Sequence, residues 1–248
     1  LGLPLTAAEV GSGRGRSRHG HAFDVMGDLA MNDADGKAGW QARHHSLLEE
    51  LVRVLRGVWG ARVDYEPADY RDYSDTRPDL TIEGAGADGG KYVGDTKCFD
   101  SVGSDPARVD ARGGHVAFGN TQPHANEVTV GRAERGEEGR QFNPRTGLGH
   151  VARVKGAYDK TVLLGVEVAP LLFETWGGWS PAVVDLLKRA EIGHGRKLRR
   201  HEYEQATWAT RTWHVFAAQR ISCALTRAAA HTVARELSLS TARDTRDD

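Results

Sequence analysis

Cysteine is scarce in this chain, and its scarcity excludes two kinds of stabilised scaffold. Only two cysteines occur among the 248 residues, Cys98 and Cys223, and they are far apart with no CxxC or Cys/His spacing. We therefore expect neither a structural zinc site nor a disulfide framework. Such cysteine usage is typical of a reducing compartment, so the sequence predicts an intracellular protein, nuclear or cytoplasmic.

Long apolar runs are also missing. No stretch of the sequence approaches the length needed to span a membrane, and the N-terminal residues lack the apolar segment of a signal peptide. The sequence therefore predicts no membrane partner. Because the chain begins at Leu1 rather than at a methionine, we expect a segment of a longer protein.

Neither sign of charge is in excess. The 33 Lys and Arg residues balance 34 Asp and Glu residues, which gives a formal net charge of −1. A protein that coats nucleic acid without sequence preference would be strongly basic, so any nucleic-acid binding here must use local patches. The 39% of hydrophobic residues suffices for a core, while 30 glycines against 6 phenylalanines favour a loop-rich fold.

The composition divides the chain into three parts. Residues 1–40 are rich in Gly, Arg and turn-forming residues and are expected to be poorly ordered, whereas 41–238 carry the periodic patterns of a globular domain. Residues 239–248 are expected to be a disordered tail. Within the domain, residues 100–149 form a charged, Gly-rich, irregular insertion, and loops of that length are often functional.

The periodic patterns predict an α/β fold. A helix is expected over 40–60, where Leu48, Leu51, Val52, Leu55 and Trp59 form one apolar stripe. The β-rich segments 61–67, 77–84 and 91–99 follow, and a Gly/Asp cluster joins the last two as a hairpin.

The second half of the domain predicts a helix, a strand and further helices. We expect a helix over 148–160, a buried strand over 161–173, a helix with Ser180 as N-cap and Pro181 in its first turn, and a long helical region over 201–237. The whole order predicts a mixed central β-sheet flanked by helices.

Three charged residues of the hairpin are expected to meet. Side chains alternate across a strand, so Asp95 and Lys97 project from the same face, and Asp79 lies in the neighbouring strand. Two carboxylates at one place suit Mg²⁺, with Mn²⁺ as a substitute. Such an ion lowers the pKa of a bound water, and the lysine stabilises charge on a phosphate, so the pattern predicts phosphodiester hydrolysis.

The predicted first helix offers further polar candidates. Glu49 lies at the border of the apolar stripe, one turn after His45, and is the better candidate for a metal ligand. Glu50 points away from the stripe and is expected to be solvated. His44 and His45 are open to two interpretations, as phosphate contacts or as structural histidines.

The hairpin carries a family resemblance. Arg77-Pro78-Asp79, followed after a Gly-rich turn by Gly94-Asp95-Thr96-Lys97, resembles the signature of the PD-(D/E)xK superfamily of restriction-endonuclease-like proteins. The resemblance implies an αβββαβ core with C-terminal helices and a Mg²⁺-dependent DNA endonuclease. The implied catalytic residues are Asp79, Asp95, Lys97 and Glu49. The implied metal ligands are Asp79, Asp95, Glu49 and the backbone carbonyl of Thr96.

Several residues are expected to contact nucleic acid. The helix predicted over 148–160 lies where many members of that superfamily carry a phosphate-contacting cluster, and the segment 196–200 is basic. A solvated basic loop is an equally good interpretation of that segment. The predicted contacts are His45, Arg77, Arg153, Lys155, Tyr158, Arg196 and Lys197.

A narrower resemblance concerns the source of the domain. The segments GHA, RHHSLLEEL, RPDL, ETWGGWSP and QRIS, spread over most of 20–225, resemble the endonuclease-like domain that follows some eukaryotic reverse transcriptases. This resemblance implies that the domain comes from a mobile genetic element (a retrotransposon) and belongs to a reverse-transcriptase-containing polyprotein. It implies DNA as the partner, and it leaves open RNA or a hybrid as substrate and a homodimer as the oligomeric state. The chain lacks the cysteines that some such domains carry near the first motif, so a zinc knuckle is not implied. The alternative is a non-catalytic nucleic-acid-binding or interaction module that retains the fold.

Overall fold

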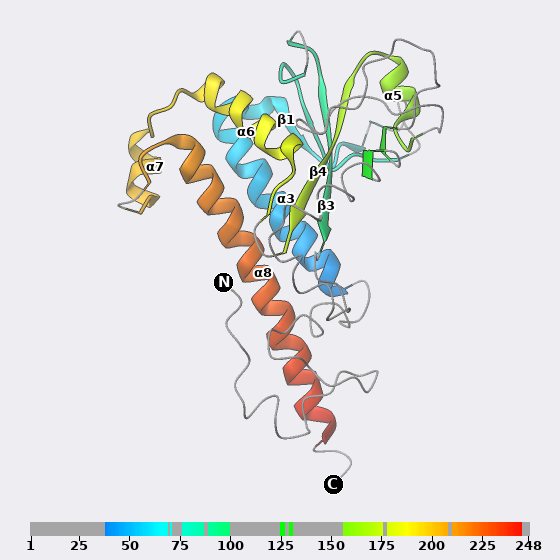
Figure 1. The fold of residues 1–248 in the computed structure, drawn as a ribbon, viewed down its shortest axis with the longest axis vertical. Coiled ribbons are helices and arrows are strands. Elements are labelled where there is room, and N and C mark those ends of the chain that lie inside the picture. Colours follow the sequence, from blue (N-terminus) through cyan, green and yellow to red (C-terminus); the bar gives the residue numbers. More distant parts are fainter. Residues whose placement is uncertain are drawn as a thin grey trace.

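The computed structural model shows helices packed against a small β-sheet (Figure 1). It describes residues 38–68, 70, 76–86, 89–99, 125–126, 129–130, 156–175, 178–207 and 210–244. The expected poorly ordered segment 1–40 and irregular insertion 100–149 lie almost entirely outside these residues, as does the end of the expected tail. Over the described part of the chain, no helix is both long and apolar enough to cross a membrane.

Four strands form one mixed sheet in the order β1-β2-β3-β4. Strands β1 (Val63–Tyr65), β2 (Leu80–Ile82) and β3 (Tyr92–Phe99) pair antiparallel. The β2–β3 pair is the hairpin that the Gly/Asp turn predicted. Strand β4 (Glu167–Glu174) pairs parallel to β3 along its whole length. The predicted α/β class with a mixed sheet is therefore confirmed.

One face of the sheet is covered by three helices, α3 (Ala38–Trp59), α6 (Pro181–His194) and α8 (Trp213–Asp244), which gather on one side of β3 and β4 in Figure 1. The predicted stripe of α3 is buried there, with Leu48, Leu51 and Leu55 all inaccessible to solvent. Apolar side chains of all three helices and of the sheet join in one core cluster. This cluster supplies most of the hydrophobic stabilisation and fixes α3 against the sheet.

The other face carries a smaller apolar cluster beside the short helix α5 (Asp159–Leu163). Its buried members are Tyr70, Val93, Val130, Tyr158 and Val168. Because side chains alternate along β3, Tyr92 and Cys98 point to the large core, whereas Val93 points to the small cluster. Asp95 and Lys97 are in phase with Val93, so they project from the face that α5 partly covers.

The strand predicted over 161–173 begins later than expected. Residues 161–163 belong to α5, and a turn at Gly165, with φ of 75°, separates that helix from β4. Leu163 and Leu164 are exposed, so the apolar run is not a single buried strand. The helix predicted over 148–160 corresponds, within the described residues, only to α5.

The long helical region predicted over 201–237 is two helices. Helix α7 (Arg200–Gln205) ends before the threonine-rich segment, and α8 begins at Trp213 and continues to Asp244, through part of the tail expected to be disordered. The hydroxyl of Thr212 accepts the backbone N–H of Val215 and so caps the start of α8. Local threonine hydrogen bonds of this kind compete with helix continuation.

The predicted start of α6 is confirmed at Pro181, but Ser180 has a different partner than expected. Its hydroxyl accepts the backbone N–H of Leu172 at 3.2 Å, and its own N–H donates to the carbonyl of Leu172 at 3.0 Å. Ser180 therefore joins the start of α6 to β4 instead of capping the helix with its side chain.

Gly94 marks a position where the sheet tolerates no side chain. A Cβ there would lie 2.9 Å from Leu171 Cδ1 and 3.0 Å from Leu80 Cδ1, closer than packed carbons approach. We expect Gly94→Ala to lower the free energy of unfolding by about 1–3 kcal/mol, measured by urea titration. Gly57→Ala is the matched control, because a Cβ there meets nothing within 4 Å and helix α3 gains about 0.5–1 kcal/mol from alanine. Equal stability of the two variants would contradict this packing.

Candidate functional site

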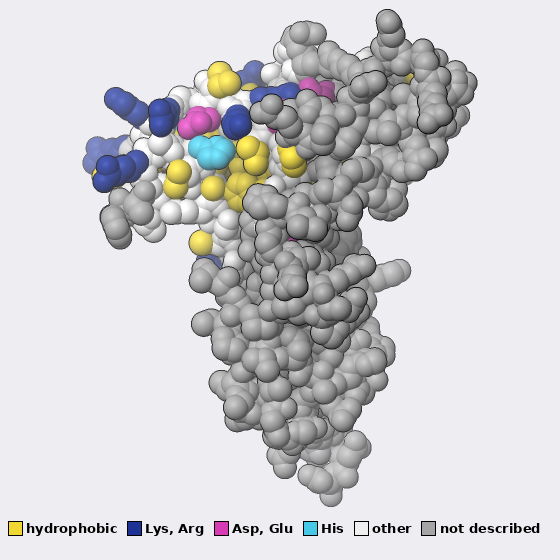
Figure 2. Space-filling model, in the orientation of Figure 1, with side chains coloured by type: hydrophobic (Ala, Val, Ile, Leu, Met, Phe, Trp, Pro, Cys, Tyr) yellow, Lys and Arg dark blue, Asp and Glu magenta, His cyan; other side chains and the backbone are white. Residues whose placement is uncertain are grey.

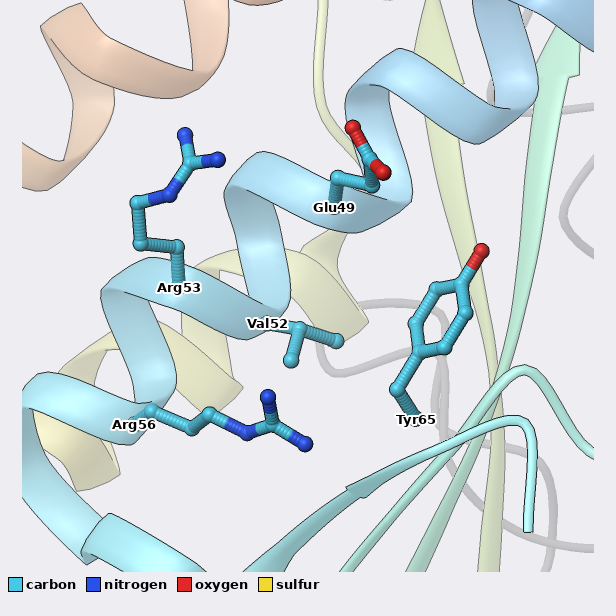
Figure 3. A pocket seen from close by; sticks show the side chains of 5 residues that line it. All are labelled: Glu49, Val52, Arg53, Arg56 and Tyr65. Carbon is cyan, nitrogen blue, oxygen red and sulfur yellow. The ribbon is translucent and has the colours of Figure 1, made fainter.

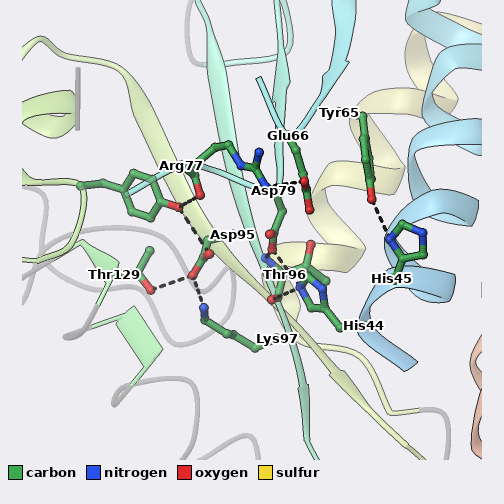
Figure 4. A network of polar contacts seen from close by, with 11 residues as sticks. His44, His45, Tyr65, Glu66, Arg77, Asp79, Asp95, Thr96, Lys97 and Thr129 are labelled. Carbon is green, nitrogen blue, oxygen red and sulfur yellow. Dashed lines mark hydrogen bonds and ion pairs between the residues drawn. The ribbon is translucent and has the colours of Figure 1, made fainter. Parts of the chain in front are cut away.

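The hairpin brings Asp79 beside Asp95 and Lys97. Leu80 pairs with Gly94, so continuing this register by one residue sets Asp79 opposite Asp95. The Asp79 carboxylate also accepts the backbone N–H of Thr96 at 2.5 Å (Figure 4). Asp79 is thereby tied to β3 between the two other charged residues.

Asp95 and Lys97 form an ion pair on the same face of β3. Lys97 Nζ lies 2.8 Å from Asp95 Oδ2, and the lysine side chain is 43% exposed whereas that of Asp95 is 9% exposed. The carboxylate of Asp95 is thus buried in the site, and the ammonium of Lys97 extends from it towards solvent.

The surroundings of Asp95 make its charge unfavourable. Burial raises the pKa of Asp95, the charge and hydrogen bond of Lys97 oppose this, and the nearby Asp79 adds to the increase, so the net pKa is above its ordinary value. Because the lysine does not fully offset the effect of burial, any further cation placed next to this carboxylate would stabilise its ionised form. Groups with perturbed pKa values are found more often at functional sites than elsewhere.

The buried hydroxyl of Tyr158 lies beside the carboxylate of Asp95. Its hydroxyl lies 3.4 Å from Asp95 Oδ1 and 3.3 Å from the carbonyl of Arg77, and the side chain is almost fully buried. Burial, followed by the charges of Asp95 and Asp79, raises the Tyr158 pKa, so the hydroxyl stays protonated and donates. Tyr158 was expected to contact phosphate; its ring lies in the small core cluster, and its hydroxyl is directed at Asp95 and the carbonyl of Arg77.

Thr129 is a site residue that the sequence did not identify. Its hydroxyl is 3.5 Å from Asp95 Oδ2, and its carbonyl accepts the backbone N–H of Tyr158 at 3.1 Å. It comes from the segment expected to be an irregular insertion. The length of that insertion was the only signal, and it does not point to any one residue.

His44, rather than its neighbour His45, reaches the carboxylates. His44 Nε2 lies 3.1 Å from Asp79 Oδ2 and 3.0 Å from the carbonyl oxygen of Thr96. Burial by itself lowers the pKa of His44, but the hydrogen bond and charge of Asp79 outweigh it and leave the pKa raised. The apolar stripe contained this signal, since His44 is one helical turn before Leu48 and in phase with it.

His45 and Glu49 lie on a different side of α3. His45 Nε2 is 3.1 Å from Glu49 Oε1, and the hydroxyl of Tyr65 is 2.8 Å from His45 Nδ1. Glu49 is 53% exposed and lines a pocket of about 460 Å³ between α3 and β1 (Figure 3). The remaining lining residues are Val52, Arg53, Arg56 and Tyr65. Among the described residues, the ion-pair partner of Glu49 is His45 and not a group of the Asp79 site.

Glu50 was expected to be solvated, and this expectation is wrong. It is buried and forms ion pairs with Arg53 of the same helix and with Arg220 of α8. The sequence pattern treated α3 as buried along one stripe. Because α8 packs along a second side of α3, Glu50 lies in the interface between the two helices.

The remaining predicted contacts are distributed over the molecule. Arg77 is exposed and donates to Glu66, whose N–H donates to the carbonyl of Asp79 at 2.9 Å. Arg196 and Lys197 are exposed in the segment between α6 and α7, where Figure 2 shows Lys and Arg side chains gathered. Arg153 and Lys155 lie outside the described residues.

The basic segment is remote from the carboxylates. The adjacent Arg199 donates to the carbonyl of Gly57 at 3.0 Å, whereas His44, at the other end of α3, contacts Asp79. Thirteen residues of α-helix separate the two contacts, which corresponds to about 20 Å. The structure therefore does not bring Arg196 and Lys197 to the Asp79 site.

The oxygen atoms of the site fit a hydrated divalent cation. In the described part of the chain, no three His, Cys, Asp or Glu side chains are placed to hold a metal ion by themselves. Mg²⁺, however, is usually bound by one or two carboxylates together with waters and substrate phosphate. The Asp79 carboxylate and the Thr96 carbonyl converge on one hydrogen-bond donor, His44 Nε2, so they supply two such oxygens at one point.

The chain was compared with protein-family models, with curated proteins and with solved structures, and no match was found in any of the three. The functional interpretation depends on the contacts of the site itself.

Proposed function

We propose that this chain is a metal-dependent DNA endonuclease that hydrolyses phosphodiester bonds at Asp79, Asp95 and Lys97. The observation that carries the proposal is the Lys97–Asp95 ion pair of 2.8 Å on β3, with Asp79 bound to the intervening Thr96 N–H. The element order α3, β1, β2, β3, α5, β4 also agrees with the αβββαβ core implied by the PD-(D/E)xK resemblance.

Each residue of the site has a role in this reaction. Asp79, Asp95 and the Thr96 carbonyl would hold Mg²⁺, or Mn²⁺ in its place, and the ion would supply Lewis-acid chemistry for a phosphoryl oxygen and a bound water. The exposed ammonium of Lys97 binds the scissile phosphate and stabilises the charge that develops on it. Tyr158 and Thr129 fix the orientation of Asp95 through their hydroxyl groups.

The source of the domain follows from the narrower resemblance. A place beside a reverse transcriptase in a mobile-element polyprotein makes DNA the expected substrate, since integration requires a cut in DNA. A homodimer would place one such site on each strand, as closed two-fold symmetry does in many oligomers.

The proposal is tested by cleavage of a supercoiled plasmid with Mg²⁺, with Mn²⁺ and with EDTA. We expect nicking that requires metal and that falls by about 10²–10³-fold in Asp95→Ala and in Lys97→Ala. Asp64→Ala and Lys188→Ala are matched controls, because both residues are exposed and lie on β1 and α6, away from the site. Nicking at the same rate by all five proteins, or none by the folded native chain, would refute the catalytic assignment.

A nucleic-acid-binding module that retains the fold is the second candidate. The observation that favours it is the exposed basic segment around Arg196 and Lys197, remote from the carboxylates. This candidate predicts retention of DNA that weakens with salt and that persists in Asp95→Ala. Loss of retention in Arg196→Ala with Lys197→Ala, together with an absence of nicking, would favour it over the endonuclease.

A further inference from the structure

The imidazole of His44 lies where two metal-binding oxygens converge. Its Nε2 atom is 3.1 Å from Asp79 Oδ2 and 3.0 Å from the carbonyl oxygen of Thr96, and it is drawn between them in Figure 4. Asp79 directly precedes β2 and Thr96 lies in β3, so the two oxygens come from the two arms of the hairpin. The nitrogen thus completes a set of three electron-rich atoms.

The separations match the edges of an octahedral coordination sphere. Ligands at about 2.1 Å from Mg²⁺ or a similar ion, at right angles to each other, are about 3.0 Å apart. The two distances from His44 Nε2 agree with this value without any movement of the backbone. The nitrogen is therefore spaced as a neighbouring ligand of each of the two oxygens, and the rest of the sphere is left to Asp95, water and phosphate.

The position of His44 is fixed by the fold. The side chain is 16% exposed, and its helix is anchored one and two turns further on by Leu48 and Leu51, which are inaccessible to solvent. A ligand on a rigid helix keeps its place when the ion leaves, which is the arrangement expected of a preorganised site.

We propose that His44 Nε2 is a direct ligand of the catalytic cation, together with Asp79 Oδ2 and the carbonyl oxygen of Thr96. This inference rests on the proposed function for the ion and adds a ligand and a metal preference. An imidazole suits first-row transition ions more than Mg²⁺, so the site prefers Mn²⁺ to Mg²⁺. An ion bound there would take the place of the proton on Nε2, and the neutral ring would carry its one proton on Nδ1; an imidazolium would release its second proton to solvent.

The test is the binding of Mn²⁺ alone to the full chain, without DNA. Electron spin-echo envelope modulation of bound Mn²⁺ detects a directly coordinated nitrogen. We expect ¹⁴N modulation in the native chain and in His45→Ala, and none in His44→Ala or His44→Gln. Titration calorimetry is expected to show Mn²⁺ affinity at least about 10-fold weaker in both His44 variants. His45→Ala is the matched control, since that ring pairs with Glu49 and not with Asp79.

The possible outcomes test the ligand assignment of His44 and the proposed endonuclease function independently. Persistence of the ¹⁴N modulation in folded His44→Gln, or tighter Mn²⁺ binding in that variant, would overturn the ligand assignment even if the native chain nicks plasmid. His44→Gln keeps an amide N–H for Asp79, so it serves if His44→Ala fails to fold. Loss of the modulation in the His44 variants, with no nicking by the native chain, would establish the ligand and refute the endonuclease.

Discussion

Asp95→Asn is expected to abolish metal-dependent cleavage and at the same time to stabilise the fold. Removing a charged metal ligand costs several kcal/mol of transition-state stabilisation, which corresponds to a loss of about 10³-fold in rate. The asparagine keeps the volume of the side chain and one oxygen, which can accept from Thr129 and Lys97 in the place of Oδ2. Its NH2 group then takes the place of Oδ1 and can donate to the Tyr158 hydroxyl, which donates in turn to the carbonyl of Arg77. Cleavage and stability are therefore expected to change in opposite directions.

The sign of the stability change follows from the pKa of Asp95. Burial raises this pKa above the ordinary value of 3.8 even with Lys97 in place. The folded chain therefore holds the proton more tightly than the unfolded chain, and stability falls as the pH rises from about 3.8 through the folded pKa. Above the folded pKa the native chain carries the buried charge and the asparagine variant does not.

Thermal unfolding measured from pH 3 to pH 8 tests this prediction. We expect the melting temperature of Asp95→Asn to exceed that of the native chain at pH 7 by about 2–4 °C, and the two values to converge at low pH. Asp64→Asn, at an exposed residue of β1, is the control and is expected to leave both cleavage and melting temperature unchanged. A lower melting temperature for Asp95→Asn at pH 7 would show that the Lys97 ion pair outweighs the burial of the charge.

The sequence predicted the part of the site that depends on local periodicity. Asp95 and Lys97 share a face because strand residues alternate, and the Gly-rich turn sets Asp79 opposite them. The contacts of Tyr158 and Thr129 with Asp95 could not be predicted, because they span 63 and 34 residues of sequence and depend on tertiary packing on the sheet.

Two predictions were wrong because they relied on local sequence patterns alone. The run from residue 161 is apolar enough for a strand, but Gly165 breaks it and leaves Leu164 exposed. Helical periodicity assigned α3 one buried side, whereas α8 covers a second one. A pattern reports which residues are apolar, and it does not report how many neighbours a helix will have.

The ion pairs of Glu50 give the largest stability effect that we expect outside the core. Arg220 of α8 donates to Glu50 of α3 and also, at 2.9 Å, to Gln205. The Glu50 side chain is only 9% exposed, so Arg220→Met leaves a buried carboxylate whose remaining ion-pair partner, Arg53, is itself 62% exposed. We expect the free energy of unfolding in urea to fall by about 3 kcal/mol, near the lower end of values for one lost partner of a buried pair.

The double variant Glu50→Met, Arg220→Met separates two contributions to the free energy of unfolding: the cost of leaving the Glu50 charge unpaired and the net contribution of the Glu50–Arg220 pair. Two apolar side chains of similar size can pack between α3 and α8 without desolvating a charge, so the double variant is expected to be more stable than Arg220→Met alone. Arg200→Met is the matched control, because the Arg200–Glu204 pair is 95% and 65% exposed and its loss should not be measurable. A double variant that is less stable than Arg220→Met would mean that Glu50 becomes solvated once Arg220 is lost. In that case, α8 is held to α3 by the apolar contacts of the core alone.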